Sequence, residues 1–305
     1  MSQPVDSRQT AVVIPTYNHA HFLASAIESV LAQTLPVTEV IVVDDGSADR
    51  PEEVTRRFPQ AHLLRQENRG LAAARNAGLR SATARYLIFL DADDRLRPEA
   101  AMRGLELLES DPGAGMAYGG YCNVGHHGDA GPAVFSPVPR DAFGAFLRGN
   151  QVGMHAAVMY RRAPLEAVGG FREGLPACED YDVYLRLSRR YPVLCRPEVL
   201  AEYWRHGENM SRNSALMLRS ALDVLAAHRD AAMQAGLMQD YRAGVAGWKQ
   251  HYASAWVAGA RGMWRGKMDR RALRQGLGVL RLAPTQLVRG ALAAVAGKAL
   301  GRQSP

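Results

Sequence analysis

The chain has 305 residues, of which 47% are apolar and 22% charged, a balance typical of folded globular proteins and unlike that of disordered or fibrous ones. Its net charge is +7, and all of this charge lies in the tail. Residues 270–305 contain seven Lys or Arg residues and no acidic residue, so the charges of residues 1–269 sum to zero. Because the body of the protein is neutral and the basicity belongs to the tail, the high net charge is no argument for nucleic-acid binding, and we expect no nucleic-acid partner.

The cysteines and the hydropathy pattern predict a cytoplasmic protein. Cys122, Cys178 and Cys195 have neither the even number nor the close spacing of a disulfide framework or a zinc site, so we expect reduced thiols. No stretch approaches the roughly 20 apolar residues of a membrane span, and residues 1–10 lack the apolar core of a signal peptide.

Three continuous apolar runs predict strands that are buried on both faces, at residues 11–15, 40–43 and 86–90. Between them apolar residues recur with helical spacing, as they do from Phe22 to Leu31. Strands that alternate with helices predict right-handed βαβ units and an α/β fold with a parallel sheet. The glycine-rich stretch 119–131, which contains His126 and His127, is predicted to be a loop.

Each predicted strand ends in a polar cluster, at residues 16–18, 44–45 and 91–94. Asp and Asn commonly end strands and begin turns, but in a parallel sheet these three ends share one edge, where ligands bind. The turn after the first strand lacks the glycines of a dinucleotide site, and no GxxxxGK[ST] loop occurs. Asp91 and Asp93 are hard oxygen ligands that suit Mg²⁺ or Mn²⁺.

Seven segments, taken in order, resemble the motifs of the family 2 glycosyltransferases with the GT-A fold. They are VVIPTYN (12–18), VIVVDDGSAD (40–49), ENRGLAAARNAGL (67–79), YLIFLDADD (86–94), GGF (169–171), CEDYDVYLRL (178–187) and YWRHGENMS (203–211). The resemblance implies a Rossmann-like, mostly parallel sheet flanked by helices, in a nucleotide-sugar-binding and catalytic domain that spans residues 1–211.

The resemblance also implies an activity. It is the inverting transfer of a sugar from a nucleotide diphosphate donor, most often UDP, to a hydroxyl of a saccharide or glycolipid, in the synthesis of a cell-surface polysaccharide. Carried over by position, the nucleotide would contact Pro15, Thr16, Tyr17, Asp45 (base), Arg75 (base or phosphates) and Asp91 (ribose). Asp93 would hold Mn²⁺ or Mg²⁺, with His206 as a further metal or diphosphate contact. Asp180 would be the general base, and His155 would lie on the acceptor side.

The identity of the base has an alternative. Glu179, Asp180 and Asp182 stand at the start of a predicted helix, where acidic side chains interact favourably with the helix dipole without any catalytic role. Asp182 is therefore a rival to Asp180. Two other functions also stay open: a nucleotidyltransferase, which the missing phosphate loop disfavours, and a catalytically silent nucleotide-sugar-binding or scaffold protein, which the intact carboxylates disfavour.

From about residue 213 the composition shifts to Ala, Leu, Met and Arg, which predicts a helical C-terminal region over 212–305 with a basic tail. Residues 270–302 interleave cations with Leu and Val, and Pro284 is expected to break the helix there. Such a segment either lies peripherally on the inner face of a membrane, or packs its apolar side on the rest of the protein with its arginines in solvent.

Overall fold

The computed structural model describes residues 10–125, 128–206, 209–263 and 270–288, with side chains described outside 259–274. The chain divides into two compact units. The first comprises Met1–Phe146, Asn150–Leu175 and Glu179–Gly207, and the second comprises Leu147–Gly149, Pro176–Cys178 and Glu208–Pro305. The predicted histidine pair at 126–127 lies outside the described residues.

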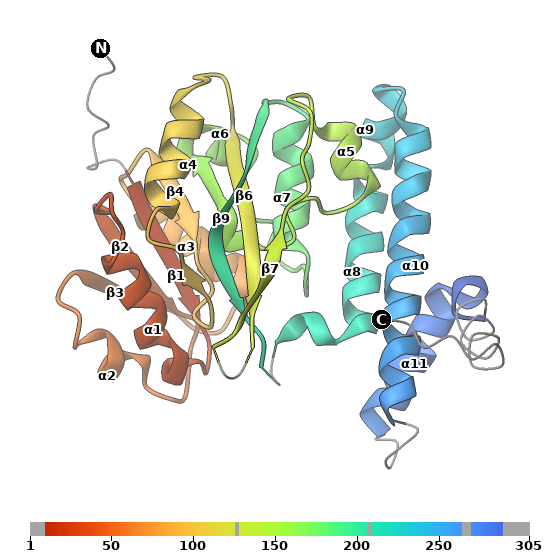
Figure 1. The fold of residues 1–305 in the computed structure, drawn as a ribbon, viewed down its shortest axis with the longest axis horizontal. Coiled ribbons are helices and arrows are strands. Elements are labelled where there is room, and N and C mark those ends of the chain that lie inside the picture. The colour runs from red at the N-terminus through yellow and green to blue at the C-terminus, as the bar shows by residue number, and fades with distance from the viewer. Residues whose placement is uncertain (1–9, 126–127, 207–208, 264–269, 289–305) are drawn as a thin grey trace. The chain divides into compact units, whose positions relative to one another are not determined.

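The first unit is built on one mixed sheet of nine strands (Figure 1). Across the sheet the order is β3 (Ala61–Arg65), β2 (Glu39–Asp44), β1 (Thr10–Thr16), β4 (Tyr86–Phe89), β8 (Val158–Arg161), β6 (Met116–Val124), β9 (Val193–Trp204) and β5 (Arg95–Leu96). The remaining strand, β7 (Ala130–Val134), pairs with β6 off this path. The helices of this unit are α1 (Ala20–Leu31), α2 (Pro51–Thr55), α3 (Leu71–Ser81), α4 (Ala100–Glu109), α6 (Arg162–Ala167), α7 (Glu179–Ser188) and the 3₁₀ turn η2 (His155–Ala157). The short helix α5 (Phe143–Arg148) has residues in both units.

The predicted α/β fold is confirmed, and the three predicted strands are neighbours in it. β2, β1 and β4 run parallel, with Val12 paired to Val40 on one side and to Ile88 on the other. Because Thr16 pairs with Asp44 and the amide of Leu90 bonds the carbonyl of Val13, the polar clusters that follow these strands share one edge. The sheet becomes mixed beyond β4, since β8 is antiparallel to both β4 and β6.

The predicted loop over 119–131 is wrong for its first half, because Gly119 and Gly120 lie within β6. A Cβ atom on Gly119 would lie 2.5 Å from the Leu200 side chain and 2.7 Å from the carbonyl oxygen of Glu198. Glycine is therefore needed here to let β9 approach β6, and its presence in the sequence does not indicate a loop.

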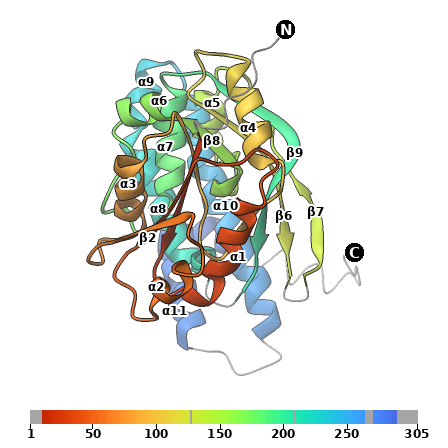
Figure 2. The ribbon, with the colours of Figure 1, turned by 90° about the vertical axis from the view of Figure 1, so that its left-hand side faces the viewer.

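Helices cover both faces of the sheet. Val12, Val40 and Ile88 point to the face where their neighbours come from α1 and α4, such as Leu23 and Leu105. The alternate residues of β1 point to the other face, where α3 packs on β1 and β2. Figure 2 shows α1 and α3 on opposite sides of β2. Burial on both faces explains why β1 and β2 read as uninterrupted apolar runs.

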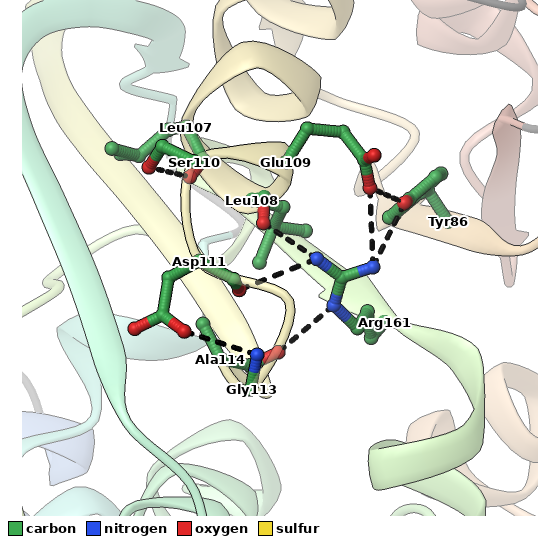
Figure 3. Close-up of polar contacts among 9 residues, drawn as sticks. All are labelled: Tyr86, Leu107, Leu108, Glu109, Ser110, Asp111, Gly113, Ala114 and Arg161. Atoms are coloured by element: carbon green, nitrogen blue, oxygen red, sulfur yellow. Dashed lines mark hydrogen bonds and ion pairs between the residues drawn. The ribbon is translucent and has the colours of Figure 1, made fainter.

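A buried arginine fastens the end of the sheet opposite the polar edge. Arg161, the last residue of β8, donates to the carbonyl oxygens of Leu108 at 2.5 Å and Ala114 at 3.1 Å, and to the hydroxyl of Tyr86 at 2.8 Å (Figure 3). It also forms an ion pair of 3.2 Å with Glu109. The carbonyl of Leu108, near the end of α4, also accepts from the amide of Asp111, so Arg161 adds a second bond there and donates to Ala114 in the turn that follows.

The second unit is helical. Its elements are η3 (Met210–Arg212), α8 (Ser214–Ala227), α9 (Arg229–Gln234), α10 (Met238–Met263) and α11 (Arg270–Leu282). As predicted, the helix breaks next to Pro284, because α11 ends at Leu282 and a new helical turn begins at Pro284. Among the described residues, no helix has the length and apolar character that crossing a membrane requires.

Candidate active site

The loops after β1 and β2 are joined by side-chain hydrogen bonds at the polar edge. The amide of Asn18 donates to Ser47 Oγ at 3.0 Å, and Asn18 Oδ1 accepts from the amide of Ala48 at 2.8 Å. Asn18 has φ = 56°, a conformation that asparagine tolerates well. The loops hold Tyr17 exposed at the edge of the sheet, while Thr16 is buried beneath it.

Asp45 organises the entry into α3. Its carboxylate accepts hydrogen bonds from Gln66 Nε2 at 2.7 Å and from the amides of Arg69 at 2.9 Å and Gly70 at 2.8 Å. The chain between β3 and α3 is therefore fixed against the end of β2. A nucleotide base that contacts Asp45 would meet a carboxylate whose orientation these three hydrogen bonds already fix.

Arg75, in the middle of α3, is buried among carboxylates. It forms ion pairs with Asp91 Oδ1 at 2.7 Å and Glu179 Oε1 at 2.5 Å, and its guanidinium lies 5.6 Å from the ring centroid of Phe171. Burial alone would lower the pKa of Arg75, but the carboxylates of Asp91, Glu179 and Asp180 outweigh it and raise the pKa. We call Arg75, Asp91, Glu179 and Asp180 the Arg75 cluster; it ties α3, the end of β4 and the start of α7 together.

Asp180 is the member of the Arg75 cluster best suited to accept a proton near neutral pH. Burial, and then the neighbouring charge of Glu179, raise the pKa of Asp180 to about 6, and Arg75 and the amide of Tyr181 oppose the rise. A carboxylate whose pKa lies just below the working pH is ionised and still basic.

Asp182, the rival base, is engaged elsewhere. It is buried, and its two carboxylate oxygens form ion pairs with Arg172 Nη2 at 3.1 Å and Arg186 Nε at 2.8 Å. Its negative charge is thus compensated by two cations, and it fastens α7 to the segment before it. The geometry favours Asp180 over Asp182 as the proton acceptor.

Asp93 and His206 meet although 113 positions separate them, with 2.7 Å between Oδ2 and Nε2. The contact depends on buried Asp94, which accepts the amide hydrogen of Trp204 at 3.0 Å and thereby draws the end of β9 to the loop after β4. Burial, and the nearby charges of Asp93 and Asp91, raise the pKa of Asp94. The ring of His206 also lies 4.6 Å from that of Phe22 at the start of α1.

The Asp93–His206 pair fits a divalent ion as a partial set of ligands. A carboxylate oxygen and an imidazole nitrogen side by side are donors that Mn²⁺ accepts. In the part of the chain that the structure describes, no group of three or more His, Cys, Asp or Glu side chains is arranged to hold a metal ion. An ion at this pair would therefore take its other ligands from water and from a bound phosphate.

His155, expected on the acceptor side, is instead buried behind the Arg75 cluster. Its ring stacks on Phe89 at 5.6 Å between centroids, and its Nε2 lies 2.9 Å from the hydroxyl of Tyr160. Burial, together with the charge of Arg75, lowers the pKa of His155 well below its usual value, so the ring is neutral. The sequence did not reveal this, because the histidine lies in a short 3₁₀ turn that has no periodic pattern.

Asn76 is a further residue of the candidate site, and the sequence did not indicate it. Its Nδ2 donates to the carbonyl of Phe171 at 2.7 Å, and its Oδ1 accepts from the amide of Phe171 at 2.8 Å. Gly170, with φ = 62°, allows this approach, because a Cβ there would lie 2.6 Å from Asn76 Oδ1. The pair of bonds holds the Phe171 ring over Arg75. An asparagine inside a helix of alanines could have signalled such a partner.

The comparisons with known proteins agree on a family. The profile described as Glycosyl transferase family 2 matches residues 11–169, just over half of the chain. An uncharacterised glycosyltransferase of Haemophilus influenzae is 29% identical over 181 residues, which cover 58% of this chain and 61% of that protein. The chondroitin synthase of Escherichia coli is 28% identical over 66% of this chain, a match that spans 29% of that longer protein.

Solved structures share the fold at low sequence identity. TarS of S. aureus (residues 1–349), solved with UDP-GlcNAc, superposes with a TM-score of 0.62 at 17% identity, covering 97% of this chain and 93% of that one. The mannosyltransferase PcManGT of Pyrobaculum calidifontis, solved with GDP-Man and Mn²⁺, gives 0.58 at 18% identity, with coverages of 99% and 92%.

Proposed function

The chain belongs to glycosyl transferase family 2, and we propose that it moves a sugar from a nucleoside diphosphate donor, UDP-sugars first, to a hydroxyl of a saccharide or lipid-linked acceptor. The observation that carries the proposal is the Arg75 cluster, which gathers three carboxylates at the edge where parallel sheets bind their ligands. One of them, Asp180, has a pKa of about 6, as a general base requires.

The proposed reaction is one displacement. The acceptor oxygen forms a bond to the anomeric carbon, the bond from that carbon to the diphosphate breaks, and the hydroxyl proton passes to the carboxylate of Asp180. Because one displacement inverts the anomeric carbon, a single base suffices and no carboxylate nucleophile is needed. Glu179 keeps Asp180 basic by charge repulsion, and Arg75 keeps Asp180 ionised above pH 6.

Asp93 and His206 are the proposed ligands of Mn²⁺ or Mg²⁺. A divalent ion held there supplies a Lewis acid that stabilises the charge on the departing diphosphate. The hydrogen bond between Asp94 and the amide of Trp204 holds the end of β9 beside the loop after β4, and so keeps the two ligand side chains next to each other.

The nucleotide is proposed to lie across the ends of β1, β2 and β4. Tyr17 is exposed there and offers a ring face, with Pro15 and Thr16 beneath it. Asp91 has one oxygen held by Arg75 and a side chain that is partly exposed, so it is available to a ribose hydroxyl. Asp45 is proposed to contact the base. Arg75 is proposed to act beside the phosphates by orienting Asp91.

The relatives support the choice of donor and metal. TarS was solved with UDP-GlcNAc, and PcManGT was solved with GDP-Man and Mn²⁺. The matches to chondroitin synthases of Escherichia coli and Pasteurella multocida favour a polysaccharide product. The carboxylates gathered around Arg75 and the raised pKa of Asp180 favour an enzyme over a catalytically silent scaffold, because groups with perturbed pKa values cluster at functional sites.

The test is release of the nucleoside diphosphate from a panel of UDP-, GDP- and dTDP-sugars, with water or simple saccharides as acceptors. We expect release from one donor class, loss of release with a chelator, and its recovery with Mn²⁺. Asp180→Asn should abolish release, whereas Asp182→Asn should keep it within a few fold. Release of the nucleoside diphosphate without any metal would contradict the role of Asp93 as a metal ligand. Release by Asp180→Asn at the rate of the unchanged protein would contradict the role of Asp180 as the general base.

A further inference from the structure

The last described helical segment of the chain is packed on one side. In the second unit α11 and the turn after it contribute Val279, Ala283 and Leu287 to an apolar cluster with Leu218 of α8 and Tyr252 of α10. A Cβ on Gly276 would lie 2.2 Å from the ring of Trp256, so the α11 backbone approaches α10 closely. The helix is therefore held with a defined face inward.

The exposed side of the segment carries large apolar side chains as well. Leu277, Leu280 and Val288 are 57%, 40% and 52% exposed, and Arg281 is exposed among them. Three of the eight large apolar side chains that are exposed in the described part of the chain thus fall within twelve residues. A helix packed on one side normally turns a polar face to solvent, so a second apolar face needs an explanation.

The charge of the tail indicates which surface would cover it. From residue 270 onward the sequence has seven cations and no acidic residue, whereas the preceding 269 residues are neutral. Arg281, the cation of this run whose side chain is described, is exposed in the segment, and pairing with a second copy of this chain would bring two tails of the same charge together. An anionic bilayer offers apolar depth for the Leu and Val side chains and anionic headgroups for the cations.

We propose that the face formed by Leu277, Leu280, Arg281 and Val288 binds the surface of an anionic lipid bilayer. Packing on the protein and binding to a membrane are then compatible for this segment: one side packs on α8 and α10, and the other side binds lipid. The helix lies in the plane of the bilayer surface and does not cross the bilayer, because its inward face remains packed in the apolar cluster with α8 and α10.

The test is cosedimentation of the full-length protein with vesicles of phosphatidylcholine containing increasing phosphatidylglycerol. We expect partitioning that rises with phosphatidylglycerol and falls with salt. The triple variant Leu277→Ser, Leu280→Ser, Val288→Ser should partition at least about tenfold more weakly. Arg281→Gln should weaken partitioning about fivefold, the equivalent of one interfacial charge.

The matched control is Met233→Ser in α9, which removes an apolar side chain of the same unit that is 59% exposed and lies outside the proposed face. It should partition like the unchanged protein. Circular dichroism checks that all variants keep their helices. Unchanged partitioning of the triple variant would overturn the proposal, as would equal binding to pure phosphatidylcholine. So would self-association in light scattering that the triple variant loses, in the absence of vesicle binding.

Discussion

Replacing Asp180 with asparagine should stop sugar transfer and, at the same time, stabilise the folded protein. The two effects have one cause: the fold holds a carboxylate where its charge is unfavourable. Burial and the charge of Glu179 raise the pKa of Asp180 from 3.8 to about 6. Asparagine has nearly the same shape without the charge, so it keeps the packing and removes the electrostatic cost.

The size of the stabilisation follows from the pKa. The folded protein binds a proton at Asp180 more tightly than the unfolded chain does, so stability falls as pH rises from about 4 to about 6 and stays lower above that. One pKa unit corresponds to about 1.4 kcal/mol. The side chain keeps some contact with solvent, so we expect Asp180→Asn to raise the free energy of unfolding by about 1 to 3 kcal/mol at pH 8.

The same exchange at Asp182 should have the opposite effect. Asp182→Asn leaves Arg172 and Arg186 without the carboxylate that compensates both of them, and both arginines are partly exposed. We expect a loss of about 1 to 3 kcal/mol, with sugar transfer retained within a few fold.

The assay is guanidinium unfolding of both variants and the unchanged protein at pH 8 and pH 4, combined with donor binding by calorimetry and release of nucleoside diphosphate. The gain of Asp180→Asn should shrink at pH 4, where the carboxyl is protonated in the unchanged protein. Asp180→Asn should still bind donor. If it is destabilised at pH 8, or if Asp182→Asn is the variant that loses transfer, the assignment of the base is wrong.

Three further predictions concern other parts of the first unit. For kcat/KM measured against pH, we expect a rise through about pH 6 as Asp180 ionises, and a flat profile there would contradict its role. Asn76→Ala removes both bonds that hold Phe171 over Arg75; chemical unfolding should show a loss of about 2 to 3 kcal/mol, and kcat should fall more than KM changes. Arg161→Met removes the donor to the Ala114 carbonyl, the Tyr86 hydroxyl and the Glu109 carboxylate, and should lower the free energy of unfolding by about 3 to 5 kcal/mol. Arg162→Met, at a partly exposed neighbour, should lower it by less than about 1 kcal/mol.

Part of the fold could be predicted from the sequence because burial determines the pattern of apolar residues along a strand or helix. β1, β2 and β4 are buried on both faces and therefore consist of uninterrupted apolar residues. β6 escaped prediction, since the glycines that let β9 approach it look the same in sequence as those of a loop. A strand shaped by close approach of a neighbour leaves no periodic signal of its own.

The proximity of the candidate site residues could be predicted where they directly follow strands, and less well where it depends on how distant segments pair. The ends of β1, β2 and β4 indicated a shared edge, but the contact of Asp93 with His206 depends on where β9 ends. Likewise, three acidic residues stand in the first turn of α7, and the sequence alone does not say which is the base. The structure distinguishes two of them by their partners: Asp180 belongs to the Arg75 cluster, and Asp182 forms ion pairs with Arg172 and Arg186.

The claim that this edge of the sheet binds a nucleoside diphosphate through a metal at Asp93 is tested most directly by calorimetry. UDP, GDP, dTDP and CMP are titrated into the unchanged protein and Asp93→Ala, each with and without Mn²⁺. We predict binding of one nucleoside diphosphate, UDP first, that requires Mn²⁺ and is lost in Asp93→Ala while the variant remains folded. Mn²⁺-dependent binding of equal affinity in Asp93→Ala, or no binding of any nucleotide by the unchanged protein, would contradict the account.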